Sequence, residues 1–197
     1  MIEHSCPIRK VSPDDGWHYW FGYYDKCPWS PDGTKLLAHR APFCDHFPAP
    51  NDFAEVGFLE GWETDAPRFT KIGQTTAWNW QQGAMLRWCK GEPRFNTSDT
   101  EPVYTVHTST GVALTLDFGR LSRLRPEYGH PGQTDPAPDD PHPTTCGISR
   151  LDADAKTLIL SLDQLDRITA DGSARAGGDL HQHVNHLAFN PSGTRFC

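Results

Sequence analysis

The chain has 197 residues, a length that suits one domain or two. Its 10 Phe, 7 Trp and 5 Tyr are too many for a disordered chain, and its 17 Gly and 17 Pro are too many for a helical one. The formal net charge of −7 disfavours a protein that binds the backbone of DNA or RNA, because such proteins are basic. An acidic ligand would therefore need a local basic patch.

The sequence contains no apolar segment of the kind that directs secretion or spans a membrane. Its six cysteines form neither a C-x-x-C pair nor the spacing of a zinc ribbon. We therefore expect reduced thiols in a cytoplasmic protein that has no membrane partner.

A turn motif recurs along the chain. Residues 27–38 and 186–197 share the pattern aromatic-[SN]-P-[DS]-G-T-[KR]-apolar. Pro fixes φ at the first turn position and Gly supplies the positive φ that closes the turn, so each segment predicts strand, tight turn and strand. Weaker copies occupy residues 75–88 and 103–117, where Gln-Gln-Gly and Ser-Thr-Gly form the turn.

Self-similar hairpins at this spacing predict an all-β fold, a β-propeller in which each blade is a four-stranded sheet. Residues 147–160 predict the outer hairpin of one blade, with its turn at residues 153–156, and residues 160–168 predict about two turns of helix. Residues 45–64 and 125–145 predict long loops. The blade starts are expected near residues 27, 75, 103 and 183.

Four blade starts are the lower bound for closing a ring, and the last predicted strand has only begun at residue 197. We therefore expect residues 1–197 to form a single, incomplete propeller domain of about four blades or partial blades. Residues 91–102 predict a blade that has lost strands. The missing C-terminal blades are expected in a full-length protein.

The turn motifs resemble the WD40-like repeat of TolB-type propellers. Together with HYWFGYYDKCPWSPDG from residue 18, AWNWQQG from residue 77, LDFGRL from residue 116 and RLRPEYG from residue 123, they make most of the chain similar to a bacterial family of cytoplasmic propellers with no established activity. More distantly, the chain resembles oligogalacturonate lyases. That resemblance implies a larger, seven-bladed ring, a histidine-rich, manganese-type metal site at the channel mouth, and β-elimination of acidic pectin fragments.

The histidine-rich segment 181–186 is a candidate metal site. In a strand, His181 and His183 point to one face with Cβ atoms about 6–7 Å apart, so both imidazoles can reach one metal ion. Gln182 and His186 face the opposite side, or join the site if the segment is a loop. These ligands suit a divalent transition metal such as manganese. The alternatives are a polar channel mouth and a general base without metal, for which His186 is the candidate.

Two aromatic segments are candidate ligand platforms. The first ends in Tyr24 and Asp25, and exposed aromatic faces beside charged groups suit sugar rings. The second contains Trp78, Asn79 and Gln81. On an innermost strand the two amides would line the channel and bond hydroxyl groups. For both segments the alternative is packing between blades, because Trp and Tyr bury large areas.

Several arginines are candidates for holding a carboxylate, because Arg binds carboxylates in bidentate fashion. Arg40 follows His39, and Arg123 lies between Arg120 and Arg125. The lyase resemblance implies that such an Arg can act as a base, so Arg123 is a catalytic candidate. The alternative is surface solvation or ion pairing with the plentiful Asp residues.

Two functional hypotheses follow. In the first, the propeller is a binding or scaffold module that recognises a saccharide or peptide at its channel face. In the second, it is a metal-assisted polysaccharide lyase or hydrolase, in which His181, His183 and Gln182 hold the metal. The first is favoured, because a fold does not imply a chemistry.

Overall fold

The computed structural model describes residue 6 and residues 8–64, 66–169 and 179–197. This part of the chain is mainly β, and all its paired strands are antiparallel. The elements, in chain order, are β1 His18–Trp20, β2 Leu36–Ala41, β3 Ala54–Glu60, β4 Arg68–Thr75, β5 Arg87–Cys89, β6 Glu92–Arg94, β7 Thr105–Val106, β8 Ala113–Thr115, α1 Phe118–Leu124, β9 Gly147–Leu151, β10 Lys156–Ser161 and α2 Leu162–Thr169.

The first sheet is a meander in the order β1-β2-β3-β4. Leu37 of β2 and Val56 of β3 are fully buried on one face, where they pack with Leu86 from the following segment. Ala41 and Ala54 lie in the adjoining cluster with Trp78. These side chains therefore direct one face of the sheet onto the residues just after β4.

The prediction of a loop over residues 45–64 is wrong, because this range contains β3, an inner strand of the first sheet. In the structure, a Cβ on Gly57 would lie 2.2 Å from the backbone oxygen of Thr70, so this glycine allows β4 to approach closely. The glycine serves strand packing rather than a chain reversal.

The middle unit is smaller. Asn79 and Gly83 exchange backbone hydrogen bonds of 3.3 and 2.9 Å, which confirms a turn at Gln-Gln-Gly. Residues 76–80 form no strand, however, since β4 already ends at Thr75. Only β6 occupies residues 91–102, as expected for a unit with few strands.

The second sheet has the order β10-β9-β8-β7, again a meander. Its inner hairpin turns at Gly111, and β9 and β10 form the outer hairpin that the sequence predicts. The predicted helix corresponds to α2, whereas α1 was not predicted. No helix or strand occurs in residues 125–145, which confirms a long loop there.

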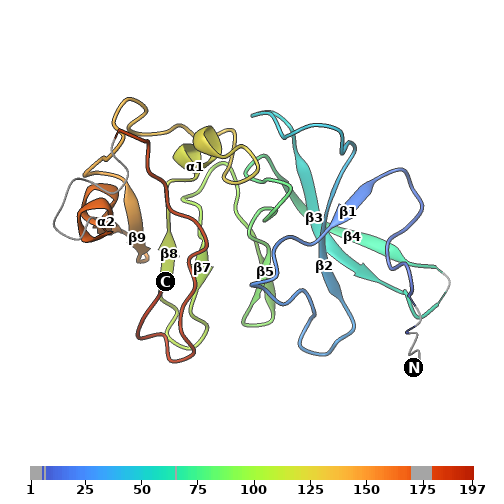
Figure 1. Cartoon of the computed structure of the whole chain (residues 1–197). Coiled ribbons are helices and arrows are strands. Elements are labelled where there is room, and N and C mark those ends of the chain that lie inside the picture. Colours follow the sequence, from blue (N-terminus) through green and yellow to red (C-terminus); the bar gives the residue numbers. More distant parts are fainter. Residues whose placement is uncertain (1–5, 7, 65, 170–178) are drawn as a thin grey trace, which may run out of the picture.

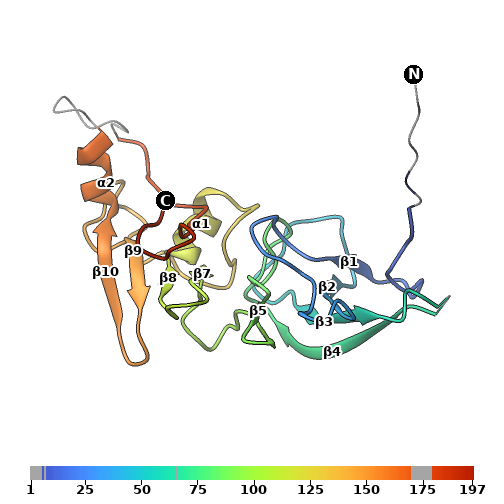
Figure 2. The same ribbon diagram turned by 90° about the horizontal axis from the view of Figure 1, so that it is seen from below.

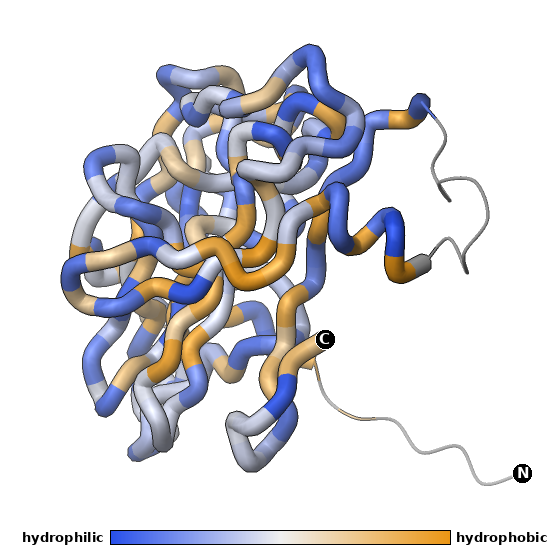
Figure 3. The backbone as a smooth tube through the Cα atoms, turned by 90° about the vertical axis from the view of Figure 1, so that its left-hand side faces the viewer, coloured by the Kyte–Doolittle hydropathy of each residue, from blue (hydrophilic) through white to orange (hydrophobic). Residues whose placement is uncertain are grey.

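The three units follow one another in space in their sequence order (Figures 1 and 2), with β5 and β6 between the two sheets. The C-terminal residues 179–197 return to run beside β7 and β8, and a bridge between Phe189 and Phe196 closes their hairpin. Figure 3 shows orange, hydrophobic stretches of the chain running through the middle of the molecule, with blue, hydrophilic stretches frequent in the outer loops. Leu187 lies in the core cluster with Leu114 and Phe118.

All six cysteines are unpaired. Among the described residues, no helix has the length and apolar character needed to cross a membrane.

Candidate functional site

A buried tyrosine connects three segments that are distant in sequence. Tyr104, just before β7, is 1% exposed. Its Oη accepts a hydrogen bond from Gln82 Nε2 at 2.8 Å and one from the backbone N–H of His186 at 2.8 Å, and it donates to Asn185 Oδ1 at 3.0 Å. Burial raises the pKa of Tyr104, so the phenol remains a donor at neutral pH. This network fixes residues 185–186 against the Gln-Gln-Gly turn.

An aromatic cluster, made of Tyr23, Tyr24, Tyr128 and His186, lies beside this network. The rings of Tyr23 and His186 stack at 5.1 Å between centroids, and Tyr24 packs on Tyr23 at 4.3 Å. Tyr128 contacts His186 edge-on at 5.7 Å. Tyr24 is nevertheless 85% exposed, so the cluster holds one aromatic ring out to solvent.

His186 adopts a φ of +60°, a left-handed conformation that is uncommon for a residue with a side chain. Its backbone N–H is held by Tyr104 Oη and by Asn185 Oδ1 at 2.9 Å. Strained backbone of this kind persists only where the surroundings determine it. The Tyr104 network therefore positions the imidazole for its stacking contact with Tyr23.

Asp25 and Lys26 continue from the cluster. Lys26 Nζ lies 2.6 Å from Asp25 Oδ2 and 5.6 Å from the centre of the Tyr104 ring. Burial lowers the pKa of Lys26, while Asp25 opposes that change. The structure thus brings three sequence-predicted residues, Tyr24, Asp25 and His186, into one region.

The histidine segment does not adopt the expected arrangement. Residues 181–188 form no strand, so the alternation that would place His181 and His183 on one face does not apply. His181 Nδ1 instead lies 3.2 Å from Arg123 Nη2, and the backbone oxygen of Gln182 accepts a 2.6 Å bond from Arg120. Among the described residues, no three His, Cys, Asp or Glu side chains are grouped so that they could hold a metal ion.

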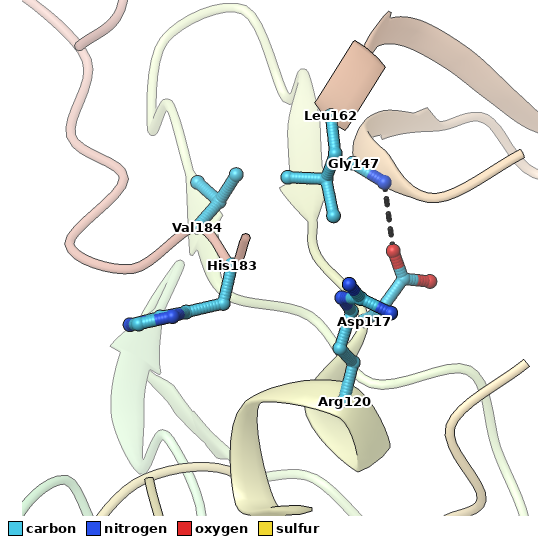
Figure 4. A pocket seen from close by; sticks show the side chains of 6 residues that line it. All are labelled: Asp117, Arg120, Gly147, Leu162, His183 and Val184. Atoms are coloured by element: carbon cyan, nitrogen blue, oxygen red, sulfur yellow. Dashed lines mark hydrogen bonds between the residues drawn. The ribbon is translucent and has the colours of Figure 1, made fainter. Parts of the chain in front are cut away.

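His183 lines a small cavity whose other walls come from α1, β9 and α2. Figure 4 shows its ring directed away from Asp117 and Arg120. Burial lowers the pKa of His183, and the nearby Arg125 and Arg120 lower it further. The cavity leaves about 10 Å³, room for no more than a single water. The remaining lining residues are Gly147, Leu162 and Val184.

The second predicted platform is buried. Trp78 is 0% exposed and donates from Nε1 to the backbone oxygen of Asp52 at 2.8 Å. Asn79 is 1% exposed; its Nδ2 donates to the Gly129 backbone and its Oδ1 accepts from the Gln82 N–H. Neither side chain is accessible to a ligand. Both are packed inside the protein, as in the alternative to a ligand platform. Only Gln81 is exposed.

The predicted arginines are engaged within the chain. Arg40 bonds Glu55 at 2.8 Å and its guanidinium lies 4.3 Å from the centre of the Trp17 ring. His39 is fully buried, and this burial lowers its pKa to about 4, so it adds no positive charge at neutral pH. Arg123 bonds Asp135 at 2.8 Å. These contacts fit the alternative of internal ion pairing.

The site also contains residues that the sequence analysis did not select: Gln82, Tyr104, Tyr128 and Asn185. Tyr128 belongs to the RLRPEYG motif, which contributes only to the resemblance to a bacterial propeller family. Gln82 follows directly after the predicted Gln81, but it is the inward-facing residue of the turn. The position of Gln82 next to Gly83, which closes the turn, was the one sequence feature that could have pointed to it.

Taken together, the described residues define a mainly β protein of antiparallel sheets with a partly exposed aromatic cluster on a buried polar network. Comparison of the chain with protein-family models, with curated proteins and with solved structures found no match.

Proposed function

We propose that the sheets are blades of a β-propeller and that the aromatic cluster binds a saccharide. The repeat of the turn motif supports the propeller. Gly33 N–H donates to Ser30 and Gly193 N–H donates to Asn190, both at 2.9 Å. A side-chain oxygen of Ser30 accepts from Lys35 N–H, as that of Asn190 accepts from Arg195 N–H. The two hairpins therefore repeat one structure as well as one sequence pattern.

The observation that carries the binding function is the exposure of Tyr24. A large aromatic side chain that is 85% exposed, yet packed on a second ring, offers a rigid flat surface. Sugar rings stack their C–H faces on such surfaces, and Asp25, which is exposed beside it, can accept hydrogen bonds from hydroxyl groups. The Tyr104 network keeps this surface in place before a ligand arrives, which lowers the entropic cost of binding.

A metal-assisted lyase or hydrolase has less support. His181 lies against Arg123, and Arg123 is held by Asp135. Neither the predicted ligand pair nor the predicted base is therefore arranged for that reaction within the described residues.

The test begins with an array of neutral and acidic oligosaccharides, followed by calorimetric titration of the strongest binder. We expect Tyr24→Ala to weaken binding about tenfold, through loss of the stacking surface. Phe47→Ala is the matched control, because Phe47 is also exposed, at 57%, but lies outside the cluster. If no oligosaccharide binds, or if both variants bind like the parent, the proposal is wrong. Binding of array peptides in a Tyr24-dependent manner would instead indicate a peptide ligand.

A further inference from the structure

A second pocket lies next to the aromatic cluster and carries positive charge in an acidic chain. It encloses about 270 Å³ between the segment after Tyr24, strand β5 and the β7–β8 hairpin. We call it the basic pocket. Its lining includes Lys26, Trp29, Arg87, Trp88, Thr105 and Thr108.

Arg87 is the central cation of the basic pocket. Its Nη1 donates to the backbone oxygen of Met85 at 2.8 Å, while its buried Nε has no hydrogen-bond partner. Among the described residues, no carboxylate lies within ion-pairing distance of this guanidinium. Burial lowers the pKa of Arg87, and the neighbouring Arg94, directly opposite it in the β5–β6 ladder, lowers it further. A half-buried guanidinium without a counterion is costly.

Lys26 supplies a second ammonium group to the same pocket. Its ion pair with Asp25, which also lines the pocket, balances one positive charge with one negative charge. The charge of Arg87 therefore remains uncompensated. Arg87 also lowers the pKa of Lys26, which indicates that the two cations lie close enough to repel each other.

We propose that the basic pocket binds an oxyanion group, a phosphate or a carboxylate, of a small molecule. Arg87 lines the pocket, and its terminal guanidinium nitrogens can donate charge-assisted hydrogen bonds to an oxygen of such a group. Lys26 is placed to bind a further oxygen, and the hydroxyl groups of Thr105 and Thr108 are available as donors. The pocket is larger than a bare anion, so the apolar walls from Trp29 and Trp88 would contact the rest of the ligand.

The test uses the full chain and titrates inorganic phosphate and acetate separately, at constant ionic strength, with calorimetry and thermal unfolding as readouts. We expect saturable binding of at least one anion and a rise in unfolding temperature on binding. Preference for phosphate or for acetate then identifies which oxyanion the site favours. Failure of both to bind would overturn the proposal.

Variants separate a built site from diffuse attraction. Arg87→Gln should weaken anion binding roughly tenfold to a hundredfold, as expected for loss of charge-assisted hydrogen bonds. Arg94→Gln removes the same charge from the partner strand but outside the pocket, and should change binding less than about threefold. Equal losses in the two variants would contradict the proposal.

Lys26→Gln provides a second route if Arg87→Gln fails to fold. We expect it to weaken anion binding as well, and unchanged binding would count against the proposed ligand set. Tyr24→Ala should leave anion binding intact, since Tyr24 does not line the basic pocket. The outcome here is therefore independent of whether the aromatic cluster binds a saccharide.

Discussion

The two four-stranded sheets share one topology but are stabilised differently. In the first sheet, β3 and β4 have seven and eight residues, and their face packs on tryptophan and aliphatic side chains. In the second sheet, β7 and β8 have two and three residues, and α1 and a long loop separate β8 from β9. The second sheet also packs on an apolar cluster, which includes Leu114 and Ile148, and side-chain hydrogen bonds to the backbone hold the segments around it.

Arg120 makes the most of these side-chain hydrogen bonds to the backbone. It is 1% exposed, and its guanidinium donates to the backbone oxygens of Ala137, Asp140, Pro141 and Gln182. One side chain thereby ties α1 to the long loop and to the returning C-terminal segment. The comparison indicates that both sheets pack on apolar clusters, and that the sheet of short strands depends in addition on a buried polar anchor.

The largest expected effect is therefore on Arg120. Arg120→Ala should lower the free energy of unfolding by about 5 kcal/mol, because it leaves buried carbonyl groups without their donor and removes one of the two arginines that pair with Asp135. Arg120→Lys should recover little, since an ammonium cannot supply donors in the geometry of the guanidinium fork. Chemical denaturation measures both. Arg123→Ala is the control, and a similar loss there would show that Arg120 has no special role.

The next largest effect concerns the apolar first sheet. Trp78→Ala should cost about 4 kcal/mol, through lost burial and the resulting cavity. Trp78→Phe should recover part of this loss, although the bond from Nε1 to Asp52 is absent. The same denaturation measurement applies. A loss below about 1 kcal/mol for the alanine variant would contradict a packing role.

A third prediction compares two turn glycines. Gly83 has a φ of +62°, and a Cβ there would lie 2.3 Å from the His39 ring; Gly33 has a φ of +72° and open space around it. Gly83→Ala should therefore destabilise the protein by about 3 kcal/mol, and Gly33→Ala by about 1 kcal/mol. Thermal unfolding of the two variants tests this. Equal shifts would mean that the contact with His39 does not matter.

The smallest effect is a pH dependence that involves one buried histidine from each region. Burial lowers the pKa of His39 to about 4 and that of His130 to about 3. Both remain neutral in the folded state, whereas the unfolded chain takes up protons below the ordinary histidine pKa of 6.5. Stability therefore falls as the pH drops from 6.5 toward these lowered values.

His130→Phe should reduce that loss by about 1.4 kcal/mol per pH unit between about pH 5 and 6. His130 stacks on Phe118, and neither of its ring nitrogens has a protein partner among the described residues. His39→Phe should reduce the pH dependence of the free energy of unfolding by a similar amount. It should also lower stability at neutral pH, because His39 Nε2 accepts a hydrogen bond from the Ala84 N–H. Unfolding at several pH values checks both. If the free energy of unfolding of His130→Phe depends on pH as in the parent, then His130 does not cause this loss of stability.

The sequence predicted the features that depend on local turn chemistry. Gly33, Gly83, Gly111 and Gly193 all adopt positive φ, and the outer hairpin and α2 lie where the pattern placed them. It did not predict β3, because this strand is defined by its pairing with β2 and β4, which are separate segments of the chain. Local sequence carries no record of such a long-range contact.

The candidate site shows the same division. Tyr24, Asp25 and His186 could be selected from residue type, but their convergence depends on Tyr104, which had no distinguishing pattern. Trp78 and Asn79 were selected from an assumed strand that ends earlier, at Thr75. Arg87 could not be predicted as a site residue, because the absence of a counterion is apparent only from the three-dimensional structure.

A crystal structure of the protein with its best array oligosaccharide tests the central claim most directly. The account predicts a sugar ring stacked on Tyr24, with a hydroxyl group hydrogen-bonded to Asp25 and the Tyr104–Asn185–His186 contacts unchanged. A sugar bound away from the aromatic cluster, or a cluster that rearranges on binding, would contradict it.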